Sequence, residues 1–185
     1  MAEFKSGFVA MLGRTNVGKS TLLNMLVGEK VAATANKVQT TRTAIKGIVN
    51  RENSQIIFID TPGIHKPKTK LNETMVETSF GVINEIDLIL FVIEATSEDI
   101  GRGDMRILEK IKESHKKAIL IVNKIDLVKR EKLLHLIDIY QKEYNFEAVI
   151  PISSLKEKYK DIILDEIEKN LKPGPAYYDI EEYTD

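Results

Sequence analysis

Runs of consecutive apolar residues recur along the chain, separated by longer and more polar stretches. The runs span residues 8–12, 56–59, 88–93, 118–122 and 149–152. Because helices cover both faces of a parallel sheet, its central strands are apolar on both sides rather than alternating. Runs this short also favour strands over buried helices. We therefore predict buried parallel strands over these ranges, and an edge strand over the more alternating and polar segment 44–51.

Between the runs lie segments whose apolar residues recur at helical intervals, as on one face of a helix. These segments cover 21–27, 71–83, 105–112, 133–140 and 162–171. Strands that alternate with helices predict an α/β fold with a doubly wound sheet. In such sheets ligands bind at the edge formed by the carboxyl ends of the strands, so functional residues are expected there.

Composition and charge narrow the range of functions. The 185 residues carry a net charge of −1 and no cysteine. The charge balance argues against a nucleic-acid-binding surface, and the lack of cysteine excludes disulfides and thiolate metal sites. The longest apolar run, 88–93, is far shorter than the roughly 20 residues of a membrane-spanning helix, and residues 1–6 do not resemble a signal peptide. We therefore expect a cytoplasmic protein.

The composition changes at Pro173-Gly174-Pro175, and the chain is polar and acidic from there to Asp185. Prolines this close together exclude a helix. We therefore expect one domain over residues 1–172 and interpret 173–185 as a linker to a further domain. A frayed chain end has equal weight as an alternative.

The segment Gly13 to Ser20 follows the first apolar run and matches the phosphate-binding pattern G-x-x-x-x-G-K-[ST]. Its glycines allow the backbone to wrap closely around a phosphate, so that N–H groups point at the oxygens. Lys19 would place its charge on the β- and γ-phosphates, and the Ser20 hydroxyl would bind Mg²⁺. The expected nucleotide contacts in this segment come from Asn16, Val17, Gly18, Lys19, Ser20 and Thr21.

Two further segments are candidates for binding the metal and the γ-phosphate. Asp60 follows the run 56–59 and would hold Mg²⁺ through a water molecule, while Gly63 would let a backbone N–H approach the γ-phosphate. A threonine between the first helix and the edge strand could close over Mg²⁺ when the γ-phosphate is present, which would make this loop a switch. We choose Thr41 over Thr40 as the residue that closes over Mg²⁺. Taken alone, each of these two segments also fits an ordinary turn.

The segment Asn123-Lys124-Ile125-Asp126 follows the run 118–122. The Asp126 carboxylate can accept hydrogen bonds from both N1–H and the exocyclic amine of guanine, whereas adenine has no such donor pair. Asn123 and Lys124 would brace this loop. After the last run, backbone N–H groups could bind guanine O6 from Ser153, Ser154 and Leu155. Because these segments all follow strands, they are expected at one edge of the sheet, which predicts a GTP-binding site.

These motifs, with Gln39 to Arg42, Asp60 to His65 and Tyr183 to Asp185, closely resemble those of the Era family, bacterial Ras-like GTPases of ribosome assembly in the TRAFAC class. The resemblance covers essentially the whole chain. It implies a three-layer P-loop NTPase fold with a Ras-like, mostly parallel sheet of six strands, one of them an antiparallel edge strand. It also implies a KH domain after the linker, which binds small-subunit ribosomal RNA and the 30S subunit, and possible peripheral association with the inner membrane.

The expected reaction is slow hydrolysis of GTP, with Lys19, Thr41, Gly63 and Asn16 as catalytic residues. Ras-type enzymes orient the attacking water with a glutamine just after the Asp-x-x-Gly motif, but this position is Ile64 here. Some relatives of this kind use K⁺, bound partly by an asparagine at the position of Asn16. We therefore expect a rate on the order of 10⁻⁴ to 10⁻³ s⁻¹, faster in K⁺ than in Na⁺. A nucleotide-gated binding module with negligible hydrolysis, an RNA-binding domain and an ATPase are the alternatives.

Overall fold

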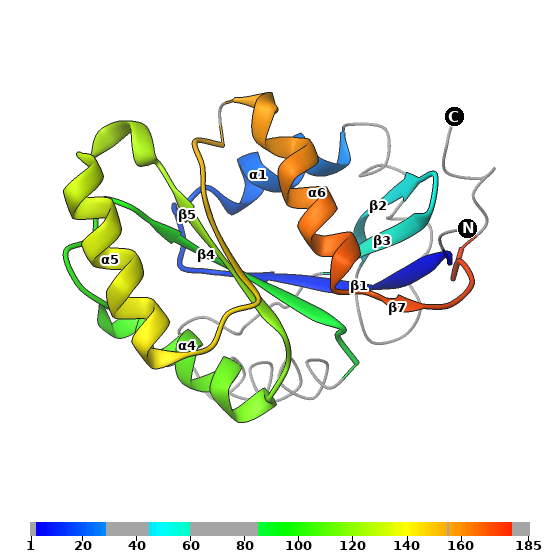
Figure 1. The fold of residues 1–185 in the computed structure, drawn as a ribbon, viewed down its shortest axis with the longest axis horizontal. Coiled ribbons are helices and arrows are strands. Elements are labelled where there is room, and N and C mark those ends of the chain that lie inside the picture. Colours follow the sequence, from blue (N-terminus) through cyan, green and yellow to red (C-terminus); the bar gives the residue numbers. More distant parts are fainter. Residues whose placement is uncertain (1–2, 29–44, 60–84, 155, 179–185) are drawn as a thin grey trace.

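A computed structural model describes residues 3–28, 45–59, 85–154 and 156–178 (Figure 1). The strands are β1 (Lys5–Leu12), β2 (Ile45–Arg51), β3 (Ser54–Ile59), β4 (Leu88–Glu94), β5 (Ala118–Asn123), β6 (Ala148–Pro151) and β7 (Lys172–Pro173). The α-helices of these ranges are α1 (Lys19–Val27), α4 (Arg102–Ser114), α5 (Arg130–Glu143) and α6 (Lys160–Lys169). Short 3₁₀ turns are η1 (Ile125–Leu127) and η2 (Glu157–Tyr159).

The strands form one sheet in the order β2-β3-β1-β4-β5-β6, with β7 pairing beside β1. The pairs of β1 with β3 and β4, of β4 with β5, and of β5 with β6 are parallel, whereas β2 runs antiparallel to β3. The predicted doubly wound, mostly parallel sheet with an antiparallel edge strand is therefore confirmed, but the sheet has seven strands rather than the expected six, because the short strand β7 adds a second antiparallel pair. The strand order reverses at β1, which places the loop after β1 at the switch point where such sheets bind ligands.

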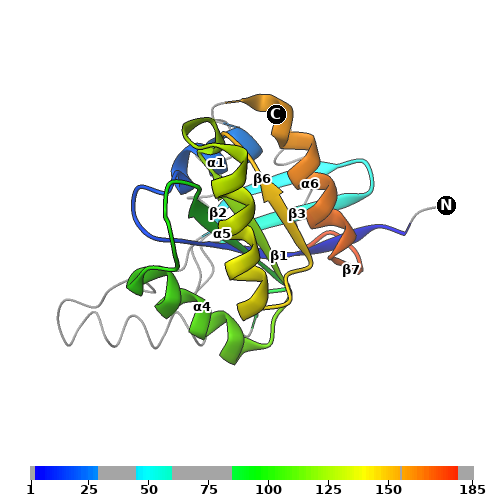
Figure 2. The ribbon, with the colours of Figure 1, turned by 60° about the vertical axis from the view of Figure 1, so that its left-hand side comes forward.

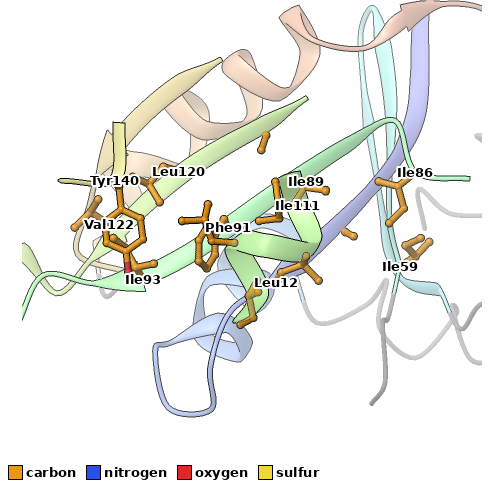
Figure 3. Close-up of a cluster of buried hydrophobic side chains, with 14 of the residues drawn as sticks. Leu12, Ile59, Ile86, Ile89, Phe91, Ile93, Ile111, Leu120, Val122 and Tyr140 are labelled. Carbon is orange, nitrogen blue, oxygen red and sulfur yellow. The ribbon is translucent and has the colours of Figure 1, made fainter. Parts of the chain in front are cut away.

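Alternate residues of the central strands pack into separate cores on the two faces of the sheet. On one face, Phe91 of β4 and Leu120 of β5 pack with residues of α4 and α5, including Tyr140 (Figure 3). On the other face, Leu90 and Ile121 pack with residues of α1 and α6. Figures 1 and 2 show these helix pairs on opposite sides of the sheet. This double burial is the physical reason for the continuous apolar runs in the sequence.

The helices α1, α4 and α5 confirm the helical segments predicted at 21–27, 105–112 and 133–140, and α6 confirms the segment predicted at 162–171 except for its last two residues, which follow the end of the helix. The segment 71–83, also predicted to be helical, lies outside the described residues. Within the described ranges, no helix is both long and apolar enough to cross a membrane.

Residues 172–178 lie against the start of β1 and the side of β3. Lys5 pairs with Pro173 in the antiparallel β1–β7 ladder, which the sequence did not predict. The Gln55 side chain, which is fully buried, accepts hydrogen bonds from the backbone N–H groups of Tyr177 and Tyr178 at 2.9 and 3.1 Å, and donates to the Tyr178 carbonyl at 3.0 Å. The first residues of the predicted linker are therefore attached to this domain. The domain boundary and a linker role for 173–185 stay predictions.

Candidate nucleotide-binding site

The loops that follow β1, β5 and β6 converge on one cavity of about 790 Å³. Its lining residues are Thr15, Asn16, Gly18, Lys19, Ser20, Thr21, Asn123, Lys124, Asp126, Leu127, Ser153 and Ser154. Most of the described residues that the sequence assigned to phosphate or guanine binding thus share one space. Val17 does not line it, because its side chain is fully buried in the core beneath the loop.

The phosphate loop, residues 13–20, has a backbone that only certain residues adopt easily. Gly18 has φ +100° and Asn16 has φ 67°, both in the left-handed region where glycine and asparagine are favoured. Gly18 is also the N-cap of α1, and it supplies no side chain to cap the first turn. Residues 19–21 at the start of the helix line the cavity, so the N–H groups of its first turn, which no side chain caps, are close to it, an arrangement suited to an anion. Beside them, Lys19 Nζ donates to the carbonyl oxygen of Gly13 at 2.5 Å.

Asn123, at the end of β5, joins the loops that surround the cavity. Its side chain is almost completely buried. Asn123 Nδ2 donates to the Val17 carbonyl at 2.9 Å and to Ser154 Oγ at 3.2 Å. Its Oδ1 accepts from the N–H groups of Lys124 at 2.8 Å and Ser154 at 2.9 Å. All of the side chain's polar atoms are thus bonded within the protein, so Asn123 braces the site.

Ser153 and Ser154 follow β6 and reach the same cavity. The sequence interpretation has the N–H of Ser154 directed at guanine O6. In this structure the Ser154 N–H instead donates to Asn123 Oδ1, because the loop after β6 packs directly on the end of β5. Asp126 lies in η1 and is exposed at the cavity, where its carboxylate is accessible to a ligand. Leu155 lies outside the described residues.

A network of charged side chains connects the loops that line the cavity. The sequence did not predict this network. Lys124 Nζ donates to the Asn16 carbonyl at 2.9 Å and to Glu94 Oε2 at 3.0 Å. Glu94 Oε1 lies 3.3 Å from Arg14 Nη2, and Arg14 Nε lies 3.0 Å from Asp104 Oδ1. Glu94 directly follows the apolar run 88–93, just as Asn123 directly follows the run 118–122. This position after a strand is the sequence feature that could have identified Glu94.

Asp104 is fully buried in the first turn of α4, where it lies between Arg14 and Tyr140. Its Oδ2 accepts a hydrogen bond from the buried Tyr140 hydroxyl at 3.2 Å. The Arg14 contact is close enough for an ion pair, but Nε and Oδ1 do not meet hydrogen-bond geometry. We therefore treat it as an attraction between charges rather than a directed bond.

Burial controls the protonation of this network. Burial raises the pKa of Asp104 above its ordinary 3.8, although Arg14 and the Tyr140 hydroxyl act in the opposite direction. Burial, together with the nearby Asp104 charge, also raises the pKa of Tyr140, so its hydroxyl keeps its proton. For Arg14 burial lowers the pKa, but the attraction of Asp104 and Glu94 outweighs it and raises the pKa. Arg14 is therefore a permanent cation at the back of the phosphate loop.

Three predicted site residues, Thr41, Asp60 and Gly63, lie outside the described residues. The described range 45–59 ends at Ile59, which lines a second cavity of about 170 Å³. Its lining residues are Met11, Lys19, Ser20, Leu23, Lys46, Phe58 and Ile59. Lys19 and Ser20 line both cavities, so the end of β3 lies close to the phosphate loop.

Comparison with known proteins agrees with this geometry. The model of a protein family described as 50S ribosome-binding GTPase matches residues 8–124. The chain belongs to the 50S ribosome-binding GTPase family. Within the family it is 48% identical over 183 residues to GTPase Era of Ruminiclostridium cellulolyticum, a match that covers 99% of this chain and 61% of that protein. It is 49% identical over 174 residues to GTPase Era of a Thermoanaerobacter species, covering 94% of this chain and 57% of that protein.

Solved structures of this GTPase family have the same fold. A crystal structure of Era with MgGDPNP and nucleotides 1506–1542 of 16S ribosomal RNA matches with a TM-score of 0.78 and 41% identity, covering 95% of this chain and 60% of that chain. An Aquifex aeolicus Era variant bound to GDP and AlF₄⁻ matches with a TM-score of 0.75 and 40% identity, covering 95% and 60%. The chain thus spans about three fifths of the length of the relatives it matches.

Proposed function

We propose that this chain is the GTP-binding and GTP-hydrolysing domain of a longer protein of the Era type. One observation carries the proposal: the phosphate loop and the guanine loop, Asn123 to Asp126, open into a single cavity, and Asn123 is bonded to both of them. A triphosphate and a purine base are joined in one molecule, so a site that binds both needs its loops held at a fixed separation.

The phosphate loop would bind the nucleotide through backbone N–H groups of residues 16–21 and through Lys19. The Lys19 ammonium already faces the loop, where it donates to the Gly13 carbonyl. Phosphate oxygens would replace that carbonyl as its acceptor, which would place the positive charge on the β- and γ-phosphates.

Mg²⁺ fits the residues at this end of the cavity. Ser20 supplies a hydroxyl, a hard oxygen ligand of the kind Mg²⁺ prefers, and it lines both the large cavity and the smaller cavity beside Ile59. Bound Mg²⁺ would neutralise charge that develops on the phosphates. We further propose Thr41 and Asp60 as ligands, Asp60 through water, and the backbone N–H of Gly63 as a γ-phosphate contact. The solved Era structure with MgGDPNP supports the use of Mg²⁺.

Asp126 would select guanine by accepting hydrogen bonds from N1–H and the exocyclic amine. Its exposure at the cavity supports this role. Calorimetry with GTP, GDP and ATP, with and without Mg²⁺, tests the proposal: tight binding of the guanine nucleotides and not of ATP is expected. Asp126→Asn should weaken GDP binding and favour xanthosine diphosphate, whose base presents an acceptor where guanine has its amine. Absence of guanine nucleotide binding by the unaltered chain would contradict the proposal.

Hydrolysis is proposed to be slow and to use K⁺ near Asn16. Single-turnover assays should detect hydrolysis that Lys19→Ala abolishes, and no turnover above that control would instead favour a binding module. For the K⁺ role, Asn16→Gly is a better variant than Asn16→Ala, because glycine tolerates the left-handed φ of 67° while lacking the carboxamide. Hydrolysis should be faster in K⁺ than in Na⁺ for the unaltered chain only. Equal rates in the two salts would refute the K⁺ role.

In the longer protein, we propose that the nucleotide state is coupled to binding of small-subunit ribosomal RNA and of the 30S subunit through a KH domain. The solved complex of the relative Era with a 16S ribosomal RNA segment supports this coupling. A cytoplasmic location is part of the proposal, and peripheral association with the inner membrane rests only on family resemblance. Comparing RNA binding by the full-length protein loaded with GTP analogue or GDP tests the coupling. Equal RNA affinity in the two states would argue against it.

A further inference from the structure

Glu94 occupies a position from which one side chain reaches both halves of the nucleotide site. It ends β4, and its register partner on β5 is Asn123, the first residue of the guanine motif. The backbone adds a further link at this point, because the N–H of Ala95 donates to the Asn123 carbonyl at 2.8 Å. The side chain of Glu94 is 23% exposed, so its contacts are partly shielded from water.

The two carboxylate oxygens of Glu94 have different partners. Oε1 lies 3.3 Å from Arg14 in the phosphate loop, and Oε2 lies 3.0 Å from Lys124 in the guanine loop. Lys124 then returns to the phosphate loop by donating to the Asn16 carbonyl at 2.9 Å. These contacts close a ring that joins both loops.

Charge makes a carboxylate important at this place. Arg14 and Lys124 are both cations, and both contact the Glu94 carboxylate. Without Glu94, no negative charge would lie between these two cations. Asp104 also neutralises Arg14, but no contact from Asp104 to Lys124 is observed among the described residues. Of these two carboxylates, Glu94 therefore holds both loops, whereas Asp104 holds one.

We propose that Glu94 is a positioning residue that couples the phosphate loop to the guanine loop and thereby slows nucleotide release. This inference rests on the proposed function, because it requires that a guanine nucleotide spans the cavity. The nucleotide can leave only when both loops release it, and a rigid connection between them makes simultaneous release rare. We expect nucleotide release to depend on Glu94 more strongly than chemistry at the γ-phosphate does, because its side-chain contacts are with Arg14 and Lys124.

The test compares Glu94→Gln with Asp104→Asn. Both variants remove a carboxylate charge that contacts Arg14, but only Glu94→Gln also removes the one that contacts Lys124. Release of fluorescent GDP is measured by stopped flow. We expect Glu94→Gln to release GDP about tenfold faster, as expected for the loss of charge-assisted hydrogen bonds, and Asp104→Asn at most about threefold faster. Single-turnover hydrolysis of bound GTP is measured for the same variant, and Glu94→Gln should change it by a smaller factor than it changes GDP release.

Glu94→Asp is the conservative variant, because it keeps the charge on a shorter side chain. Its rate of GDP release should lie between those of Glu94→Gln and the unaltered chain. If Glu94→Gln does not fold by circular dichroism, Glu94→Asp takes its place, with faster release expected. Unchanged release, or equal acceleration by Asp104→Asn, would overturn the inference while GDP binding by the unaltered chain still supports the proposed function. If the unaltered chain binds no guanine nucleotide, the proposed function fails and the inference fails with it.

Discussion

Replacing Gly18 with alanine should disconnect the phosphate loop from the guanine loop. Gly18 has φ +100°, and a Cβ added to it would overlap Nδ2 of Asn123. The buried Asn123 amide would have to move, and it would lose its bonds to the Val17 carbonyl at 2.9 Å and Ser154 Oγ at 3.2 Å. The substitution therefore changes both the backbone of one loop and the brace to the others.

The magnitude follows from these contacts. A left-handed conformation costs a residue with a Cβ about 1–2 kcal/mol. The two lost hydrogen bonds contribute about 0.5–1.5 kcal/mol each. Gly18→Ala should therefore lower the free energy of unfolding by about 2–5 kcal/mol, a large part of the stability of a domain.

Gly28 provides a matched control at the other end of α1. It also has a positive φ, +85°, but no atom of the described residues lies within 4 Å of an added Cβ. Gly28→Ala should therefore cost only the backbone strain, about 1–3 kcal/mol. Gly101 has φ −74°, and an added Cβ there would also meet no atom of the described part of the chain, so Gly101→Ala should be nearly neutral.

The assay is urea unfolding followed by circular dichroism, with the Gly18→Ala substitution made both in the unaltered chain and in Asn123→Ala. Once the Asn123 side chain is absent, the overlap disappears, so the cost of Gly18→Ala should fall to its backbone part. An equal cost in the two backgrounds would refute the reasoning, because it would show that Gly18 is required for its backbone conformation alone.

Further predictions concern the buried network and the end of the described chain. Tyr140→Phe removes the hydroxyl bonded to Asp104 and should lower the free energy of unfolding by about 1–3 kcal/mol in urea titrations; no loss would show that this bond is dispensable. Because the pKa of Asp104 is raised in the folded state, its contribution to stability is present below the unfolded pKa near 3.8 and is lost as pH rises through the folded pKa. The stability of the unaltered chain relative to Asp104→Asn should therefore fall as pH increases from about 3.8, and a rise would contradict the assigned direction. Gln55→Ala should increase amide hydrogen exchange at Tyr177 and Tyr178, whereas unchanged exchange would mean that other contacts hold this segment.

Much of the fold could be predicted from local patterns. The apolar runs predicted the central strands because β4 and β5 are buried on both faces, and burial leaves a continuous signal along the chain. The strand β7 could not be predicted, since two residues carry no periodicity and its pairing depends on the distant segment at Lys5. The attachment of Tyr178 to Gln55 was missed for the same reason, because an amide side chain has no local feature that identifies a partner more than a hundred residues away.

The sequence by itself determined which chemistry the chain carries. The phosphate and guanine motifs are contiguous segments whose residue types and positions after strands indicate their ligands, and 10 of the 12 residues lining the large cavity, all except Thr15 and Leu127, were among those predicted. Only the tertiary structure decided how those segments are held together. Glu94, Arg14 and Asp104 belong to different elements, and their charges meet because strand register and helix packing bring them to the same place. Charge is read from a sequence easily, but its partner is set by distance in space, which local spacing does not encode.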